Sequence, residues 1–196
     1  MSQEQYASAQ AVLEFWFGSP KDPDYGKPRK LWFQKNPDFD EEIRSRFLSL
    51  YQQAAEGKLD AWQNSPESCL ALILLLDQFP RNLFRDQPKM FATDDQALAV
   101  AQYAVKQGYD QQLLDVQRWF MYLPFEHSED LAMQHQSVAL FSKLEDNPDN
   151  ANTLDYAYRH FNVIQQFGRF PHRNAILGRE STPEEIAFLQ QPGSSF

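Results

Sequence analysis

The chain has 196 residues, of which 42% are hydrophobic and 23% are charged, so it can bury a sizeable core and is not expected to be disordered. Its formal net charge of -9 opposes binding to nucleic acid and to anionic membranes. With Cys69 as its single cysteine, it cannot form an internal disulfide or a cysteine-based structural zinc site. We expect one domain over residues 1–196.

The N-terminal residues Met1–Gln10 are polar and lack the basic and apolar regions of a signal peptide. The longest apolar stretch, Cys69–Leu76, is too short to cross a bilayer. We therefore expect a cytoplasmic protein whose partner is neither a membrane nor a nucleic acid. The sequence makes no prediction of the oligomeric state.

Helix signals account for most of the first part of the chain. Residues Ala7–Phe17 form a first predicted helix that ends at a glycine. The next stretch, Ser19–Pro37, contains four prolines and is predicted to be an irregular loop. Asp38 and Asp40 offer side-chain oxygens that cap a following helix, which runs to about Glu56.

An unbroken apolar run marks the centre of the predicted fold. Ser65 and Pro66 have the pattern of an N-cap followed by proline at the first helical position. The helix that they open contains Leu70–Leu76, which is apolar on nearly every face and is therefore expected to be central and buried. We expect Pro80 to end this helix.

The second half of the chain consists of short predicted helices separated by turn residues, and no segment alternates polar and apolar residues as a strand does. Thr93 and Ser128 are 35 residues apart, and each is predicted to cap the first helix of a helical hairpin. This spacing is close to the period of tetratricopeptide repeats. The predicted fold is all-α, with antiparallel helical hairpins stacked in a tetratricopeptide-like superhelix or in a bundle. The predicted helices of this half follow the Thr93–Gln96 capping box up to Gly108, cover Leu113–Leu123 before Pro124, run from Ser128 to about Leu144, cover Thr153–Phe167, and begin again at Thr182.

Three segments, Asp77–Asn82, Tyr122–Asp130 and Phe167–Asn174, combine a proline and an aromatic residue with charged side chains. Arginine binds carboxylates and phosphates through two parallel N–H groups, so such segments favour an anion site. The alternative is that Arg81 and Arg173 only hydrogen-bond carbonyl groups at helix ends. We predict that the three segments meet at one cleft. The ligand-binding candidates are Arg81, Asn82, Glu126, His127, His160, Arg169, His172, Arg173 and Asn174.

Glu126 and His127 are the candidate catalytic residues, because a carboxyl group and an imidazole can act together as acid and base. Both come just before a predicted helix, where a loop can present them inward. His160 and His135 each align with apolar residues on a predicted helix face, so we expect a core role for His160 and a core or boundary role for His135. No His-x-x-x-His or His-Glu-x-x-His pair and no glycine-rich phosphate loop is present. We therefore expect neither a metal nor a cofactor.

The same motif strings resemble those of an uncharacterised bacterial family, domain of unknown function 924. The resemblance covers nearly the whole chain and implies an all-helical, tetratricopeptide-like fold. It implies no particular activity, but it does imply that the motif strings belong to one site. The strings are Val12–Phe17, Leu76–Asn82, Leu123–Glu129, Phe167–Asn174 and Leu177–Thr182.

Two classes of function fit these observations. The first, which we expect, is a helical binding module whose Arg- and His-lined cleft holds a peptide or a small anionic ligand. The second is a hydrolase-type enzyme in which Glu126 and His127 form an acid–base pair and arginines hold an anionic substrate. An enzyme requires one of these two side chains to face a ligand pocket, whereas a binding module requires only an open groove.

Overall fold

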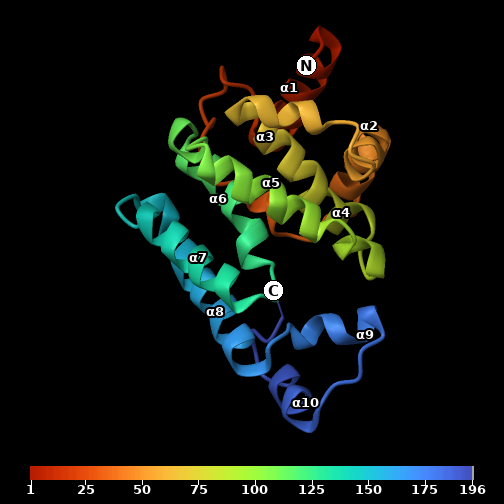
Figure 1. Cartoon of the computed structure of the whole chain (residues 1–196), viewed down its shortest axis with the longest axis vertical. Helices are drawn as coiled ribbons and strands as arrows, with labels where there is room; N and C mark the ends of the chain where they lie inside the picture. Colours follow the sequence, from red (N-terminus) through yellow and green to blue (C-terminus); the bar gives the residue numbers. More distant parts are fainter. Residues whose placement is uncertain (196) are drawn as a thin grey trace.

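The computed structural model describes residues 1–195, apart from the side chains of residues 5–7, and within that range the protein is all-α with no strand. Figure 1 shows α1 to α6 in the upper part of the molecule, the α7–α8 hairpin below them on one side, and α9 and α10 on the other. The helices are α1 (Gln3–Phe17), α2 (Pro37–Ala55), α3 (Pro66–Ile73), α4 (Phe79–Leu83), α5 (Asp94–Lys106), α6 (Asp115–Glu126), α7 (Leu131–Phe141), α8 (Thr153–Phe167), α9 (Asn174–Leu177) and α10 (Pro183–Leu189).

The central apolar helix is buried, which confirms the prediction. Every residue of Cys69–Leu76 is at most 2% exposed, and α3 packs against α1, α5 and α6. Aromatic rings surround it: the ring of Trp16 lies 5.5 Å from that of Phe79 and 5.4 Å from that of Phe120. Each large ring buries much apolar area, so these rings help to hold the upper part of the molecule together.

Pro80 does not end the central helix, contrary to the prediction, because a π-helical turn accommodates it. After α3 the chain continues through this turn, η3 (Leu74–Gln78), directly into α4. Proline lacks an N–H group and its ring crowds the carbonyl four residues earlier, which here is that of Leu76. The Thr93 hydroxyl donates a hydrogen bond to this carbonyl instead, at 2.6 Å. The turn leaves Asp77 and Gln78, two adjacent polar residues, both buried.

Two predictions about helix N-termini are wrong: a different residue caps α2, and the predicted capping box of α5 does not form. Asn36 rather than Asp38 or Asp40 caps α2, since its side chain accepts hydrogen bonds from the first free backbone N–H groups. Thr93 does occupy the N-cap position of α5, but its hydroxyl is committed to Leu76, so no capping box forms. The Gln96 side chain, which would complete that box, donates instead to the Ala55 carbonyl.

The α6–α7 turn also differs from the prediction. α6 continues through Pro124 to Glu126, because the fully buried rings on both sides of the proline, Phe120 and Phe125, keep the segment packed in the core despite the local cost. Asp130, not Ser128, caps α7 by accepting hydrogen bonds from two backbone N–H groups. The residues between the two helices are thereby left free to face the C-terminal segment.

Consecutive helices pack on one another from α5 through α8, and α8 has the bounds predicted from the sequence. Beyond Gly168, which has the left-handed conformation that ends α8, the chain folds back toward α5. A small second apolar cluster of Val163, Ile164 and Phe170 lies here, apart from the main core. Within the described residues, no helix is long and apolar enough to span a membrane.

Candidate functional site

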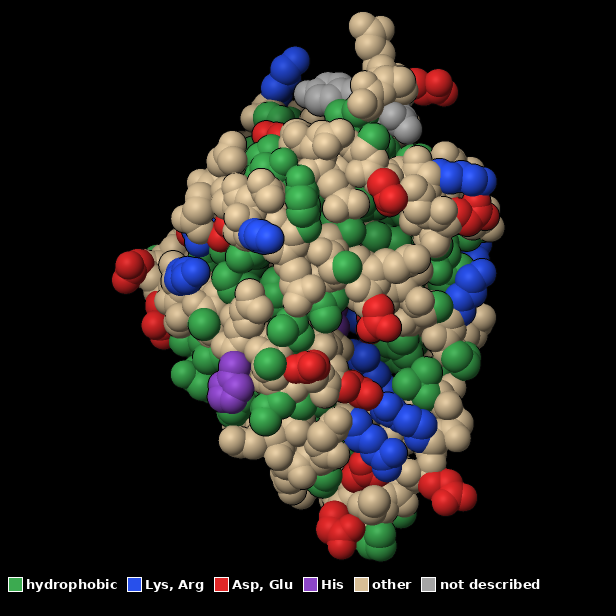
Figure 2. All heavy atoms as spheres, in the orientation of Figure 1, with side chains coloured by type: hydrophobic (Ala, Val, Ile, Leu, Met, Phe, Trp, Pro, Cys, Tyr) green, Lys and Arg blue, Asp and Glu red, His purple; other side chains and the backbone are tan. Residues whose placement is uncertain are grey.

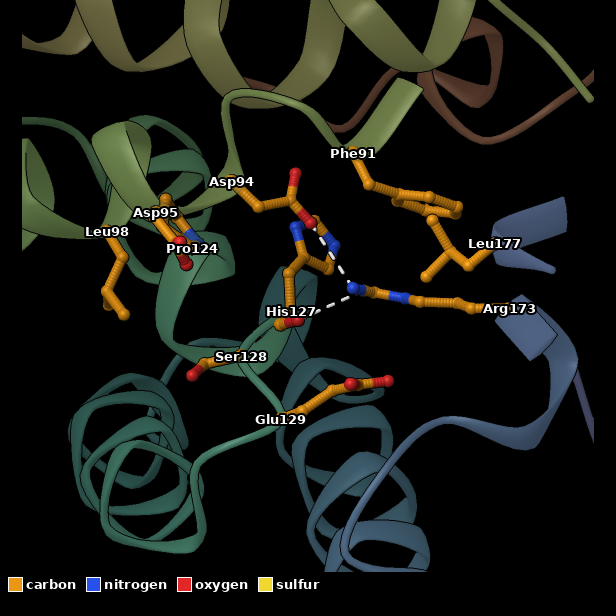
Figure 3. Close-up of a pocket in the computed structure, with 10 residues that line it drawn as sticks. All are labelled: Phe91, Asp94, Asp95, Leu98, Pro124, His127, Ser128, Glu129, Arg173 and Leu177. Carbon is orange, nitrogen blue, oxygen red and sulfur yellow. Dashed lines mark hydrogen bonds and ion pairs between the residues drawn. The ribbon is translucent and has the colours of Figure 1, made fainter. Parts of the chain in front are cut away.

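A cleft of about 240 Å³, which we call the junction cleft, lies where α5, the α6–α7 turn and the C-terminal segment meet. Figure 3 shows that α5 and the C-terminal segment lie on opposite sides of it, with His127 between them. On the outer surface, basic and acidic side chains gather next to one another over the lower part of the molecule (Figure 2). The cleft is lined by the apolar residues Phe91, Leu98, Pro124 and Leu177 and the polar residues Asp94, Asp95, His127, Ser128, Glu129 and Arg173.

Asp77 and His127 form a hydrogen-bonded pair at the base of the cleft. His127 Nδ1 lies 2.7 Å from Asp77 Oδ1, and the side chain of Asp77 is fully buried. Gln78 Nε2 donates to the other carboxylate oxygen at 2.5 Å. Although burial raises the pKa of Asp77, the positive charge of Arg81 and the contact with His127 lower it more, so its pKa lies below the usual range. An ionised carboxylate only accepts hydrogen bonds, so the ring proton of His127 must be on Nδ1.

The second ring nitrogen of His127 is open to the cleft. Nε2 has no hydrogen-bond partner among the described residues, and it is not enclosed by the protein. Burial and the charge of Arg81 lower the pKa of His127, and these effects outweigh the opposing effect of Asp77. At neutral pH the imidazole is therefore uncharged, with a free lone pair on Nε2 that can accept a proton.

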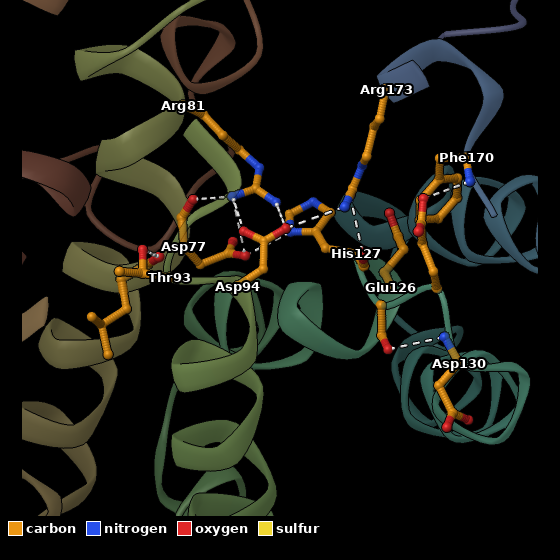
Figure 4. A network of polar contacts seen from close by, with 12 residues as sticks. Asp77, Arg81, Thr93, Asp94, Glu126, His127, Asp130, Phe170 and Arg173 are labelled. Carbon is orange, nitrogen blue, oxygen red and sulfur yellow. Dashed lines mark hydrogen bonds and ion pairs between the residues drawn. The ribbon is translucent and has the colours of Figure 1, made fainter. Parts of the chain in front are cut away.

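Two arginines meet on one carboxylate above this pair. The Arg81 guanidinium donates to both oxygens of Asp94, at 3.0 and 3.1 Å, and also to the backbone carbonyl of Asp77. Arg173 donates to Asp94 at 3.2 Å and to the carbonyl of His127 at 3.0 Å. Figure 4 shows these side chains pointing toward one another from α4, α5, the end of α6 and the C-terminal segment. Every carboxylate and guanidinium of this group is thus paired within the protein.

The Arg173 guanidinium is also enclosed by two aromatic rings. It lies 4.6 Å from the ring centroid of Phe91 and 4.6 Å from that of Phe170. Burial and the nearby charge of Arg81 lower its pKa to about 10, so it stays protonated at neutral pH. The contact with Phe91 holds the C-terminal segment against the 3-10 turn Pro88–Phe91, which precedes α5.

Glu129 makes the second link between the α6–α7 turn and the C-terminal segment. Its carboxylate accepts hydrogen bonds from Arg179 at 2.7 and 2.9 Å and from the backbone N–H of Phe170 at 2.8 Å. These contacts follow from the position of Glu129 before the α7 cap, where its side chain is not needed by the helix. Burial raises the pKa of Glu129, but the contact with Arg179 lowers it more, so the group is ionised at neutral pH.

Glu126 lies behind the cleft rather than in it. Its Oε1 is 3.2 Å from His160 Nδ1, and Oε2 is enclosed with no hydrogen-bond partner among the described residues. Burial and the charge of Asp77 raise the pKa of Glu126 to about 8, while burial lowers the pKa of His160 to about 3. Both groups are therefore neutral at pH 7, and His160 is a buried histidine, as its helix face indicated. His135, in contrast, is exposed, with its ring 4.7 Å from that of Phe161.

The predicted segments meet, but not with all their residues. Arg81, His127 and Arg173 come together at the junction cleft, with Glu126 and His160 behind them. His172 lies beside Phe170, with the ring centroids 5.5 Å apart, and burial and Arg173 lower its pKa to about 4.

Three predicted residues have other partners. Asn82 donates to Asp40 at 2.7 Å. Arg169 donates to Glu185 at 2.6 and 2.8 Å and lines a separate cleft beside α10. Asn174 donates to the same Glu185 at 3.2 Å. The carboxylates of Asp40 and Glu185 thus accept hydrogen bonds from these three side chains, none of which lines the junction cleft.

Sequence reasoning missed Asp94 and Asp95 as cleft residues, because both fit the first turn of a helix. It also missed the pairing of Asp77 with His127, which lie 50 residues apart. One available signal was the adjacent polar pair Asp77–Gln78 directly after eight apolar residues. Among the described residues, no cluster of three or more His, Cys, Asp or Glu side chains is placed to hold a metal.

The fold and the site together define an all-α protein with a small cleft built on an Asp–His pair and Arg–carboxylate contacts. The chain belongs to the family described as "Bacterial protein of unknown function (DUF924)", whose model matches residues 12–193. It is similar to a solved structure titled "Structure of Protein of Unknown Function ATU0120 from Agrobacterium tumefaciens", with 41% sequence identity and a TM-score of 0.84. That match covers 95% of this chain and 98% of the other. No curated protein matches the chain.

Proposed function

We propose that this protein is a hydrolase-type enzyme for a small molecule, with His127 as the general base and Asp77 as the residue that orients it. The observation that carries the proposal is the accessible Nε2 of His127 in a small cleft, while its Nδ1 is held 2.7 Å from a fully buried carboxylate. An Asp–His pair of this kind fixes the tautomer that accepts a proton and stabilises the imidazolium that forms. Glu126 does not take part, because it faces His160 and not the cleft.

The proposed reaction follows from this geometry. His127 Nε2 accepts a proton from a water molecule in the cleft as the water oxygen attacks the electrophilic centre of the substrate. The imidazolium, stabilised by Asp77, then transfers that proton to the leaving group, which returns His127 to its starting form. Arg81 and Arg173 position the site: Arg81 holds Asp77 and Asp94, and Arg173 joins Asp94 to the backbone of His127.

The second candidate function is a binding module within a tetratricopeptide-like stack of hairpins. The consecutive packing of α5, α6, α7 and α8 favours this arrangement, and the same cleft would then hold its ligand without reaction. A small cleft supports a small ligand better than a peptide. We expect the protein to act in the cytoplasm in either case.

The test compares the wild type with His127→Asn and Asp77→Asn on three chromogenic substrates: a p-nitrophenyl ester, an amino-acid p-nitroanilide and p-nitrophenyl phosphate. At least one should be hydrolysed, with kcat/KM at least about a hundredfold lower in His127→Asn. Because the pKa of His127 is lowered, kcat/KM should rise with pH, with a midpoint below the ordinary value for histidine.

Glu126→Gln is the matched control and should keep its activity, because that side chain lies outside the cleft. Hydrolysis that survives in His127→Asn, or the absence of hydrolysis of all three substrates, would contradict the enzyme and leave the binding module. Nitrogen NMR of His127 gives a readout independent of turnover, since the ring should be protonated on Nδ1 in the wild type and lose that preference in Asp77→Asn.

A further inference from the structure

We infer that the substrate of the junction cleft carries a cationic group, an amine or a guanidine, which binds at Asp95. This inference rests on the proposed function, since it names the substrate class of the same site. It reverses the anionic ligand expected from the sequence, because the arginines that suggested an anion are engaged by the protein.

The charges around the cleft favour a cation. Among the described residues, Arg173 is the only arginine or lysine that lines the cleft, and its guanidinium already contacts Asp94 and the His127 carbonyl. Three lining residues, in contrast, are acidic: Asp94, Asp95 and Glu129. An anion would have to displace Asp94 from two guanidiniums and would meet Glu129 and Asp95 as like charges.

Asp95 is the lining carboxylate that remains available. Asp94 is engaged by Arg81 and Arg173, and Glu129 by Arg179 and the Phe170 N–H. Asp95 is exposed and has neither an ion pair nor a side-chain hydrogen bond among the described residues. Figure 3 shows it on the α5 side, across the cleft from Arg173 and with His127 between the two. A cation bound there would place the rest of the substrate against Nε2.

The apolar residues that line the cleft indicate the nature of the uncharged part of the substrate. Leu98 and Pro124 lie on the Asp95 side, whereas Phe91 and Leu177 lie on the Arg173 side (Figure 3). A space of about 240 Å³ whose lining includes these four apolar residues fits a compact substrate with an apolar part rather than a chain of polar residues. The acidic protein as a whole, with a formal net charge of -9, also attracts cations toward the cleft.

Calorimetric titration with three ring compounds of similar shape tests this inference: benzylamine, benzyl alcohol and benzoate. Benzylamine should bind at least about tenfold more tightly than the other two at low salt, and added salt should reduce that preference. Asp95→Asn should weaken benzylamine binding about three- to tenfold and leave benzyl alcohol unchanged, whereas Asp95→Glu should retain the preference. Asp146→Asn removes the same charge from an exposed position outside the cleft lining and should leave all three affinities unchanged.

Failure of this inference can be told apart from failure of the enzyme. Equal binding of the three compounds, tighter binding of benzoate, or no binding of any would overturn the cationic substrate. So would a benzylamine affinity that is unchanged in Asp95→Asn. The proposed hydrolase is tested separately, because His127→Asn should still bind benzylamine while losing turnover. A His127→Asn protein that keeps its turnover would contradict the enzyme, whatever the charge series shows.

Discussion

The aromatic core around α3 and the C-terminal segment beyond Gly168 are held in place by different forces. The core consists of apolar side chains such as Phe79 and Phe120, both fully buried and in contact with other rings. Of the three buried residues of the small second apolar cluster, the C-terminal segment contributes Phe170, and the ion pairs Arg173–Asp94 and Arg179–Glu129 join the segment to the rest. The stabilisation from apolar burial does not depend on the ionisation of side chains, whereas the stabilisation from a pair of charges does, and it is also screened by salt. The candidate site lies where the two regions meet, so its geometry depends on the weaker set of contacts.

The largest expected effect comes from truncating a ring in the core. Phe120→Ala should lower the free energy of unfolding by about 3–5 kcal/mol, because the substitution leaves a cavity among four other rings. Urea denaturation followed by circular dichroism measures it. The matched control is Phe33→Ala, whose side chain is 65% exposed and which should cost less than about 1 kcal/mol. Similar losses for both variants would contradict the assignment of the core.

The second expected effect is a pH dependence of the free energy of unfolding, caused by the buried carboxyl group of Glu126. The pKa of Glu126 is raised to about 8 by burial and by Asp77, so the folded protein holds a proton that the unfolded chain releases near pH 4.5. The stability that this proton contributes is complete below pH 4.5 and is lost as the pH rises toward 8. Glu126→Gln should therefore stabilise the protein increasingly from pH 5 to 8, by roughly 2–4 kcal/mol at the upper end.

Thermal unfolding of Glu126→Gln and of the wild type between pH 5 and 8 measures this difference. Glu145→Gln, at an exposed position, is the control and should show no pH-dependent change. A constant offset between Glu126→Gln and the wild type at every pH would mean that Glu126 is ionised in the folded protein.

The smallest expected effect is local to the C-terminal segment. Glu129→Gln removes the negative charge that pairs with Arg179 and leaves a weaker, uncharged acceptor for the Phe170 N–H, so residues 170–189 should open more readily. Amide hydrogen exchange in this segment should become about five- to thirtyfold faster, which corresponds to roughly 1–2 kcal/mol, with little change in the core. The control Asp155→Asn breaks an exposed pair with Arg159 and should change exchange little. Faster exchange throughout the core would show that the two regions unfold as one unit.

The sequence predicted the features that are set locally. The bounds of α8 and the burial of Cys69–Leu76 follow from apolar periodicity, which a single segment displays by itself. Caps were less predictable, because several side chains compete for one helix start. Asp130 and Ser128 are both good caps, and only the folded turn decides between them.

The candidate site was predictable only in part. The motif strings named Arg81, His127 and Arg173, but not which carboxylate each would contact. Asp94 pairs with Arg173 across 79 residues of sequence, and such a choice depends on how whole helices pack. The sequence predicted an anionic ligand, whereas we propose a cationic substrate, for the same reason. The sequence shows which arginines are present but not which of them are already paired with carboxylates.

The π-helical turn at Leu74–Gln78 has a consequence for comparisons within the family. Such a turn is equivalent to one residue inserted into an ordinary α-helix. A family member that lacks this residue would rotate everything before or after it by about 100°, which would carry the counterpart of Asp77 away from the histidine. The length of this segment in an alignment, together with the aspartate and the histidine, is therefore a criterion for separating members that keep the proposed chemistry from members that keep only the fold.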